Sequence, residues 1–187
     1  MTIHATAGTL RSSGLDRCEE VTSGRLRSGV PVELGDFVVE PFDIPHDAAE
    51  PIGLVVEDRQ GRRVGVVADI GCRSQIAWAA LRDVAALVLQ AQPDREKRRP
   101  GPYPWPLKQR VASRHGHLSN ADAAHGLRDL VSDRLGLVVL YHLSRTNNFP
   151  DLAAATVGET LAAEGCGAEL RVADQFEPSC WLEVGPV

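Results

Sequence analysis

Three polar residues directly follow apolar segments that are typical of buried β-strands. His46 follows FDIP, Asp69 follows VVA and His142 follows VVLY. Strand ends hold side chains at one rim of a sheet, where α/β proteins bind ligands. Imidazole and carboxylate are also ligands that zinc, manganese and iron prefer, so the three are candidate metal ligands. Each also has a simpler interpretation, because a single strand-end histidine is more often structural and an aspartate more often forms a turn.

The hydrophobic pattern predicts the elements that must position these residues. The segment 4–9 resembles a short strand that leads into a helix, and further β-strands are predicted at 36–43, 52–57, 63–68, 84–89, 137–141 and 169–172. Helices are predicted at 73–83, 107–113, 119–134 and 151–164. The first of these helices would bury Ile76, Ala80 and Leu81. Strands that alternate with helices indicate the α/β class, and a hairpin at 52–68 makes the sheet mixed.

Length and composition fit one globular domain. The 187 residues are 43% apolar and 24% charged, which predicts a single domain over 1–187 and is too short for two. No secretory signal and no apolar stretch long enough to span a membrane is visible in the sequence. Four scattered cysteines without a C-x-x-C pair favour reduced, mostly buried thiols and a cytoplasmic location.

Charge is distributed unevenly along the chain. The net charge of −5 argues against a protein that is basic overall, but one segment holds seven basic residues and only the acid Glu96. Such a segment could face an anionic substrate or could be a solvated loop and a basic helix face. The basic residues are Arg95, Lys97, Arg98, Arg99, Lys108, Arg110 and Arg114.

Five local motifs occur in an order that resembles a known family. They are PFDIPHDA at 41–48 with PIG at 51–53, VADIG at 67–71, GPYPWPLKQR at 101–110, GHLSN at 116–120, and HLS at 142–144 followed by two asparagines at 147–148. Together they resemble the metallo-β-lactamase superfamily. More specifically, they resemble its branch of bacterial double-strand DNA exonucleases and phosphodiesterases related to cell-wall regulation and mismatch repair. The resemblance covers residues 5–173 and implies a partial αββα sandwich that lacks its first strands.

The resemblance implies a role for each candidate ligand. His46 would complete the histidine set of a first ion, Asp69 would bridge two ions, and His142 would bind the second. Paired ions of this kind clamp a phosphodiester and activate a water molecule. Asp47, Ser144 and Asn147 would orient the ligands or contact substrate.

Two further motifs have roles that stay open. His117 would either contact or protonate the substrate, as a catalytic residue beside Asp69, or help to set the helix that follows it. In the proline-rich segment, Tyr103 and Lys108 would offer a stacking surface and phosphate-binding charge. Trp105 in the same segment is better explained as packing the segment against the core.

The sequence departs from the family at three places. The ligand motif H-x-H-x-D-H is absent, and the segment 5–9 resembles the one that follows it, which predicts a chain truncated at its N-terminus. Gln90 and Gln92 stand where the branch has Glu and Asn, and Tyr141 stands where a glycine usually precedes the last histidine. These changes suggest relaxed constraint or an altered substrate.

Three functions follow from the resemblance and the departures. The chain would be a metal-dependent hydrolase of phosphodiester bonds, such as a DNA exonuclease, impaired by the missing motif. Alternatively, it would be a non-catalytic remnant that binds a partner, or a hydrolase of small cyclic phosphodiesters. The cofactor would be a divalent metal, zinc or manganese, with at most one tightly held ion. The partner would be nucleic acid or a small phosphodiester, and an exposed sheet would favour a homo-oligomer.

Overall fold

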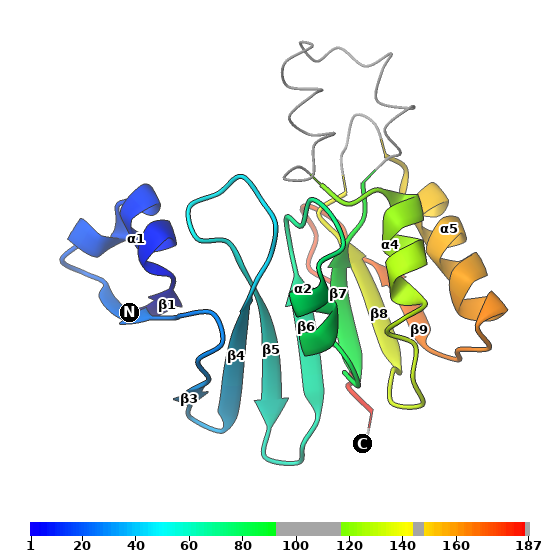
Figure 1. The fold of residues 1–187 in the computed structure, drawn as a ribbon, viewed down its shortest axis with the longest axis horizontal. Coiled ribbons are helices and arrows are strands. Elements are labelled where there is room, and N and C mark those ends of the chain that lie inside the picture. Colours follow the sequence, from blue (N-terminus) through cyan, green and yellow to red (C-terminus); the bar gives the residue numbers. More distant parts are fainter. Residues whose placement is uncertain (93–116, 144–147, 186–187) are drawn as a thin grey trace, which may run out of the picture.

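A computed structural model describes residues 1–92, 117–143 and 148–185. Its main feature is a seven-stranded sheet in the order β3-β4-β5-β6-β7-β8-β9 (Figure 1). The strands are β3 (Val32–Leu34), β4 (Phe37–Asp43), β5 (Ile52–Asp58), β6 (Arg63–Val67), β7 (Ala86–Gln90), β8 (Leu137–Tyr141) and β9 (Glu169–Val172). A separate two-stranded parallel sheet joins β1 (Thr2–Ala5) to β2 (Thr22–Arg25).

Strand direction places several strand ends at one rim of the large sheet. The pairs from β3 to β6 are antiparallel, and the pairs from β6 to β9 are parallel. Two successive antiparallel pairings bring β4 back into the direction of β6. As a result β4, β6, β7, β8 and β9 all end at the same rim. The sheet is mixed and the chain belongs to the α/β class, as the sequence predicted.

Three helices cover one face of this sheet (Figure 1): α2 (Gln75–Ala80), α4 (Asn120–Leu127) and α5 (Pro150–Ala163). The core lies between them and the strands. Val67, Leu87 and Val138 from three neighbouring strands are fully buried against Leu81 after α2 and Leu127 of α4. This packing holds β6, β7 and β8 in fixed register below the rim. A short helix, α1 (Ala7–Ser13), and a 3₁₀ turn, η1 (Leu15–Arg17), lie beside the small sheet.

The helix predicted at 119–134 ends earlier because of a tertiary contact. The indole Nε1 of Trp78 donates a hydrogen bond of 2.6 Å to the carbonyl of Gly126. That carbonyl would otherwise accept from Leu130 in a continued helix; instead Leu130 bonds to Leu127 in a tight turn. Gly126 is also required for the close approach, because a Cβ there would lie 2.4 Å from the Trp78 ring.

Other expectations also needed correction. The helix predicted at 73–83 is only α2, which Ser74 caps, and its buried side is Ala77 and Trp78 with Leu81, whereas Ile76 is exposed. The strands β2 and β3 were not predicted. The cysteines are free, as expected, but Cys18 and Cys180 are exposed rather than buried.

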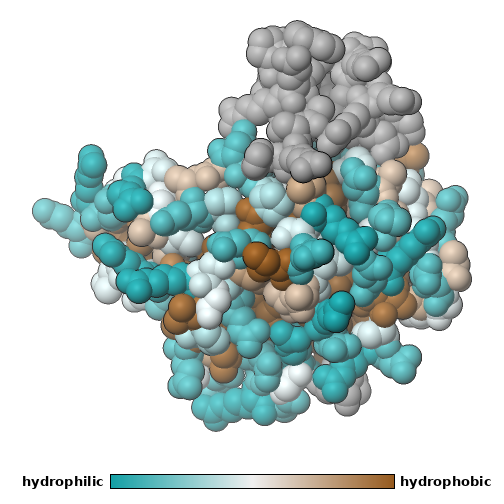
Figure 2. Space-filling view, in the orientation of Figure 1, coloured by the Kyte–Doolittle hydropathy of each residue, from teal (hydrophilic) through white to brown (hydrophobic). Residues whose placement is uncertain are grey.

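The helix-covered side of the molecule has a mostly hydrophilic surface, on which hydrophobic residues show near the centre and as separate spots elsewhere (Figure 2). No helix in the described parts of the chain is long and apolar enough to cross a membrane. The helix predicted at 107–113 and the basic segment at 95–114 lie outside the described residues.

Candidate metal centre at the rim of the sheet

The shared strand direction explains why distant residues meet. His46 follows β4, Asp69 follows β6, Gln90 ends β7 and His142 follows β8. All four therefore lie at the rim where these strands end. His117 joins them from the residues that lead into α4, which Ser119 caps by accepting a hydrogen bond from the backbone N–H of Asp122.

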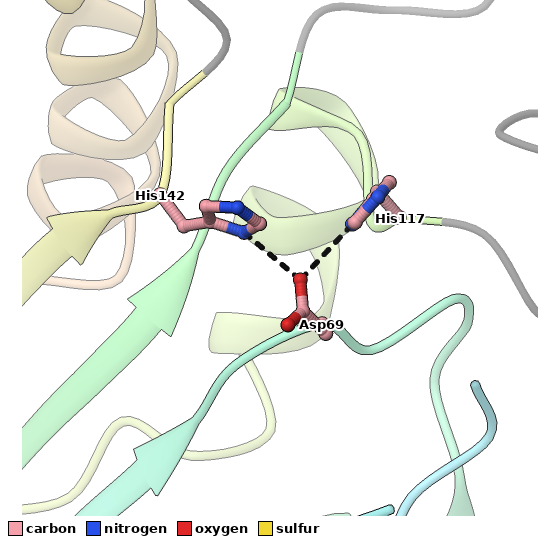
Figure 3. Close-up of side chains that lie close together, drawn as sticks. All are labelled: Asp69, His117 and His142. Atoms are coloured by element: carbon pink, nitrogen blue, oxygen red, sulfur yellow. Dashed lines mark ion pairs between the residues drawn. The ribbon is translucent and has the colours of Figure 1, made fainter. Parts of the chain in front are cut away.

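Asp69, His117 and His142 form a compact group (Figure 3). The Nδ1 atom of His142 lies 2.9 Å from Oδ1 of Asp69, and Nδ1 of His117 lies 3.5 Å from the same oxygen. One potential ligand atom from each residue lies within 4.8 Å of the others. We call these three residues the Asp69 cluster. The sequence had predicted Asp69 and His142 as metal ligands and His117 as a catalytic residue.

The backbone at two members of the cluster has an unusual conformation. Asp69 has φ of 44° and His142 has φ of 54°, both in the left-handed region that residues other than glycine rarely adopt. Each residue takes this conformation immediately beyond its strand, so the chain turns there and the side chain stands over the strand end. Such local strain persists only where the surrounding structure imposes it, and it is common at functional sites.

Asp69 and His142 shift each other's protonation. The charge-assisted contact with His142 lowers the pKa of Asp69, partial burial opposes it, and the nearby charges of His142, His117 and His46 add to the lowering. The same contact raises the pKa of His142 against the opposing effect of burial. In the chain without a ligand, the pair therefore favours a carboxylate beside an imidazolium. Burial, with the charge of Asp69, raises the pKa of the neighbouring Tyr141 to about 12.

Gln90 is a member of the site that sequence reasoning did not assign. Its side chain is fully buried, and its Nε2 lies 2.6 Å from Nδ1 of His117 and 3.0 Å from Nδ1 of His142. Gln92, two residues further on, donates from Nε2 to the backbone carbonyl of His142. The sequence marked both glutamines as departures from the family, but an amide has no metal-ligand signature that would have placed it here.

His46 lies at the edge of the cluster. Its ring centroid is 5.4 Å from that of His117, and its Nε2 lies 3.5 Å from Oδ1 of Asp47. Asp47 therefore lies within reach of the His46 ring, and its role in orienting that ring stays a prediction.

A pair of buried amides anchors the next segment of the site. Asn148 and Asn120 exchange hydrogen bonds of 3.0 and 3.1 Å between their side chains, and Asn148 also donates to the carbonyl of Ala91 just after β7. This pair ties the start of α4 and the approach to α5 to the rim. Sequence reasoning had assigned Asn147 instead, which lies outside the described residues together with Tyr103, Lys108 and Ser144.

The donor set of the Asp69 cluster fits a divalent metal. Two imidazoles and a carboxylate are common ligands of zinc and related ions. The Oδ1 atom of Asp69 is buried and has no aligned hydrogen-bond donor among the described residues. A buried carboxylate oxygen normally has well-aligned hydrogen-bond donors. The Oδ1 atom of Asp69 has none among the described residues and lies between two histidines, so it is well placed to bind a metal ion.

Comparison with known proteins identifies similar proteins and the fold. No family model matches the sequence. The exodeoxyribonuclease YycJ of Bacillus anthracis is 35% identical over 144 residues, which are 77% of this chain and 53% of that protein. The metallo-β-lactamase-fold protein YhfI of Bacillus subtilis superposes with a TM-score of 0.66 and 14% identity, over 92% of this chain and 61% of the other. The chain has the metallo-β-lactamase fold.

A second solved structure of this superfamily fold is that of Zn²⁺-bound PqqB from Methylobacterium extorquens. It matches with a TM-score of 0.63 and 19% identity, over 92% of this chain and 62% of that chain. The fold that the five motifs predicted is confirmed, and the curated relatives are named exodeoxyribonucleases, as the resemblance implied. The chain spans about half the length of the curated relatives that it matches.

Proposed function

We propose that this chain is part of a metal-dependent hydrolase of phosphodiester bonds that acts on DNA ends. The observation that supports the proposal best is the Asp69 cluster, in which two histidines approach one buried carboxylate oxygen at the shared strand rim. The similarity to proteins named exodeoxyribonucleases supports the substrate class. The proposal carries the activity in the names of these relatives over to this chain, which spans 53% of their length.

We assign the ligand roles from the geometry of the cluster. Asp69, His117 and His142 would hold a divalent ion, with His46 next to His117 as a further imidazole. This assignment makes His117 a ligand rather than the proton donor that its motif left open. When bound, such an ion supplies charge stabilisation to the phosphodiester and lowers the pKa of a bound water molecule.

The chain's own residues prepare the site for this chemistry. The lowered pKa of Asp69 keeps its carboxylate ionised, which gives a fixed negative charge at the centre of the cluster. Asp47 lies close enough to orient His46, whereas Gln90 contacts the Nδ1 atoms of His117 and His142 in the metal-free chain. The raised pKa of Tyr141, about 12, keeps its phenol neutral beside the substrate phosphates.

Metal analysis and a nuclease assay test the proposal together. After incubation with Zn²⁺ or Mn²⁺ and removal of free ions, we expect at most one ion per chain, because only part of the family's ligand set is present. Hydrolysis of end-labelled duplex DNA should accompany binding and should be lost in His142→Ala. Two ions per chain that both disappear in His46→Ala would contradict this stoichiometry. Metal binding without hydrolysis of any phosphodiester would favour the alternative of a non-catalytic binding module.

The basic segment separates DNA from small cyclic esters as the substrate. Arg98 and Arg99, which lie outside the described residues, belong to a block of positive charge in the sequence. Replacing both with glutamate should weaken binding of duplex DNA and reduce the slope of its salt dependence, because phosphate contacts release counterions. Unchanged DNA affinity and salt slope would remove the main support for DNA and favour a small phosphodiester.

A further inference from the structure

A cavity of about 510 Å³ lies beside the Asp69 cluster. It shares His142 with the cluster and opens where β8, α5 and the segment after β9 meet. Its size is within the range of roughly 300 to 1,000 Å³ that is common for small-molecule sites. The described lining residues are Tyr141, His142, Leu143, Asn148, Phe149, Pro150 and four residues after β9, Ala173–Phe176. We call it the aromatic pocket.

Three aromatic side chains distinguish the aromatic pocket from the rest of the rim. Tyr141 is partly buried, and its ring centroid lies 6.4 Å from that of His142. Phe149 and Phe176 are each 69% exposed although they line a concave site. Large exposed aromatic side chains around a cavity offer faces on which a flat ligand can stack.

The backbone that carries both phenylalanines is held in place. Oδ1 of the buried Asn148 accepts a hydrogen bond of 3.1 Å from the backbone N–H of Phe149, which begins α5. On the opposite segment, Oδ1 of Asp174 accepts from the backbone N–H groups of Phe176 and Glu177 at 2.7 and 3.0 Å. Binding therefore needs little ordering of the main chain, which reduces its entropic cost.

The chemistry of the described lining suits an aromatic ring. It is formed mainly by three aromatic rings and by the apolar side chains of Leu143, Pro150 and Ala173. An uncharged ring system can stack on these aromatic side chains. The phosphate of the same nucleotide would lie at the Asp69 cluster, which His142 joins to the pocket.

We propose that the aromatic pocket binds the unpaired terminal base of a DNA strand whose phosphodiester lies at the Asp69 cluster. The inference rests on the proposed function and deepens it, because it assigns the substrate as a frayed or single-stranded end. Tyr141 takes part in this recognition, because its ring lines the pocket beside His142.

Fluorescence of a terminal 2-aminopurine base tests the inference on the full 187-residue chain. The probes are duplexes with one unpaired 2-aminopurine at the 5′ or the 3′ end, each compared with a duplex that has an abasic site in its place. Binding is measured by anisotropy in Zn²⁺ and in EDTA, with phosphorothioate linkages at the ends to slow cleavage. For at least one polarity, we expect the fluorescence to be quenched and the base to tighten binding about tenfold over the abasic end.

Variants assign this difference to the pocket. Phe149→Ala and Phe176→Ala should each remove most of the tenfold preference while leaving affinity for the abasic duplex unchanged. Trp181→Ala is the matched control, because Trp181 is 99% exposed in the same C-terminal segment and does not line the pocket. Thermal melts would verify that these exposed positions do not affect folding.

The outcomes separate the inference from the function on which it rests. Binding of both duplexes with equal affinity, and no quenching, would overturn the pocket assignment while the nuclease proposal stands. No binding of either duplex would overturn both. A loss of self-association in Phe149→Ala, without any preference for the base in the parent chain, would show that the aromatic rings contact a second copy instead.

Discussion

Two aspartates at strand ends show how a structural carboxylate differs from one that belongs to a site. Asp58 ends β5 in the hairpin, and Asp69 follows β6 at the rim. The pKa of each is lowered, by Arg62 at Asp58 and by His142 at Asp69. The two differ in where their partners come from.

Among the described residues, the hydrogen-bond partners of the Asp58 carboxylate lie within four residues. Its carboxylate accepts from the backbone of Gln60 and Arg62 at 2.9 Å and from Nε of Arg62 at 2.7 Å. Gly61, with φ of 76°, supplies the left-handed residue of the turn, so the aspartate does not need to adopt that conformation. Asp58 is a turn former whose carboxylate is hydrogen-bonded by adjacent residues.

Asp69 differs from Asp58 in its backbone conformation and in how far its partners lie along the sequence. It adopts the left-handed conformation itself, and its imidazole neighbours are 48 and 73 residues away in the sequence. Its Oδ1 atom is buried without an aligned donor among the described residues. The comparison shows that an aspartate is a candidate ligand when the fold, rather than the adjacent chain, brings its partners to the carboxylate.

The largest expected effect comes from replacing Asp69. Asp69→Asn should weaken Zn²⁺ binding by about 100-fold or more, because it removes the central negative charge of the cluster. Stability of the metal-free chain should change by less than about 1 kcal/mol, since asparagine tolerates a left-handed backbone. Isothermal titration and thermal melts measure the two quantities. Asp58→Asn is the control and should show the reverse, a less stable chain with unchanged metal affinity.

Replacing His117 and replacing His46 should lower Zn²⁺ affinity to different extents. His117→Ala should weaken Zn²⁺ binding by about 10- to 100-fold, and more than His46→Ala does, because Nδ1 of His117 approaches Asp69 and His46 lies at the edge. Competition with a zinc-binding dye measures both variants. A larger loss in His46→Ala would restore the ligand set that the family motifs predicted.

A smaller effect, an increase in Zn²⁺ affinity, is expected when Gln90 is replaced. Metal binding through the Nδ1 atoms of His117 and His142 would break the contacts of a fully buried amide, at a cost of about 1–3 kcal/mol. Gln90→Leu removes that cost and should tighten Zn²⁺ binding about tenfold by the same titration. Gln92→Leu is the matched control, because Gln92 donates to the backbone of His142 and not to its ring. Weaker binding in Gln90→Leu would show that the amide supports the ligands.

The smallest effect is the pH dependence at Asp58. The pKa of its carboxyl is lowered below 3.8 in the folded chain, so its contribution to stability is present above pH 3.8 and is lost as the pH falls through the lowered value. The stability deficit of Asp58→Asn should therefore shrink in acid, which denaturant titrations at several pH values would detect. Asp36→Asn, which removes an exposed pair with Arg59, should cause little change at any pH. A deficit that is constant with pH would contradict the role of the carboxylate.

Local pattern predicted the strands β4 to β9 and the helix α5 well, missed β2 and β3, and predicted the ends of α2 and α4 poorly. Continuous apolar segments identified β6, β7 and β8 because buried parallel strands are apolar on both faces. The early end of α4 depends on Trp78, which is 48 residues from Gly126, and no local signal reports that contact.

The site residues also divide into those that local pattern predicted and those that only the fold brings together. His46, Asp69 and His142 follow apolar strands, so their place at a rim could be predicted from pattern, and the family motifs added their roles as ligands. His117 precedes a helix, and its distance to Asp69 follows only from the fold. Gln90 was missed as a site residue because its role depends on burial between two histidines rather than on residue type.

X-ray absorption at the zinc edge of the zinc-loaded chain tests the central claim most directly. The chain offers an alternative, because its four cysteines are free and two of them are exposed. We expect only nitrogen and oxygen neighbours at about 2.0–2.2 Å, with an imidazole signature that is lost in Asp69→Asn and His142→Ala but retained in Asp58→Asn. Sulfur neighbours at about 2.3 Å, or a spectrum unchanged by Asp69→Asn, would contradict the assignment of the Asp69 cluster as the metal centre.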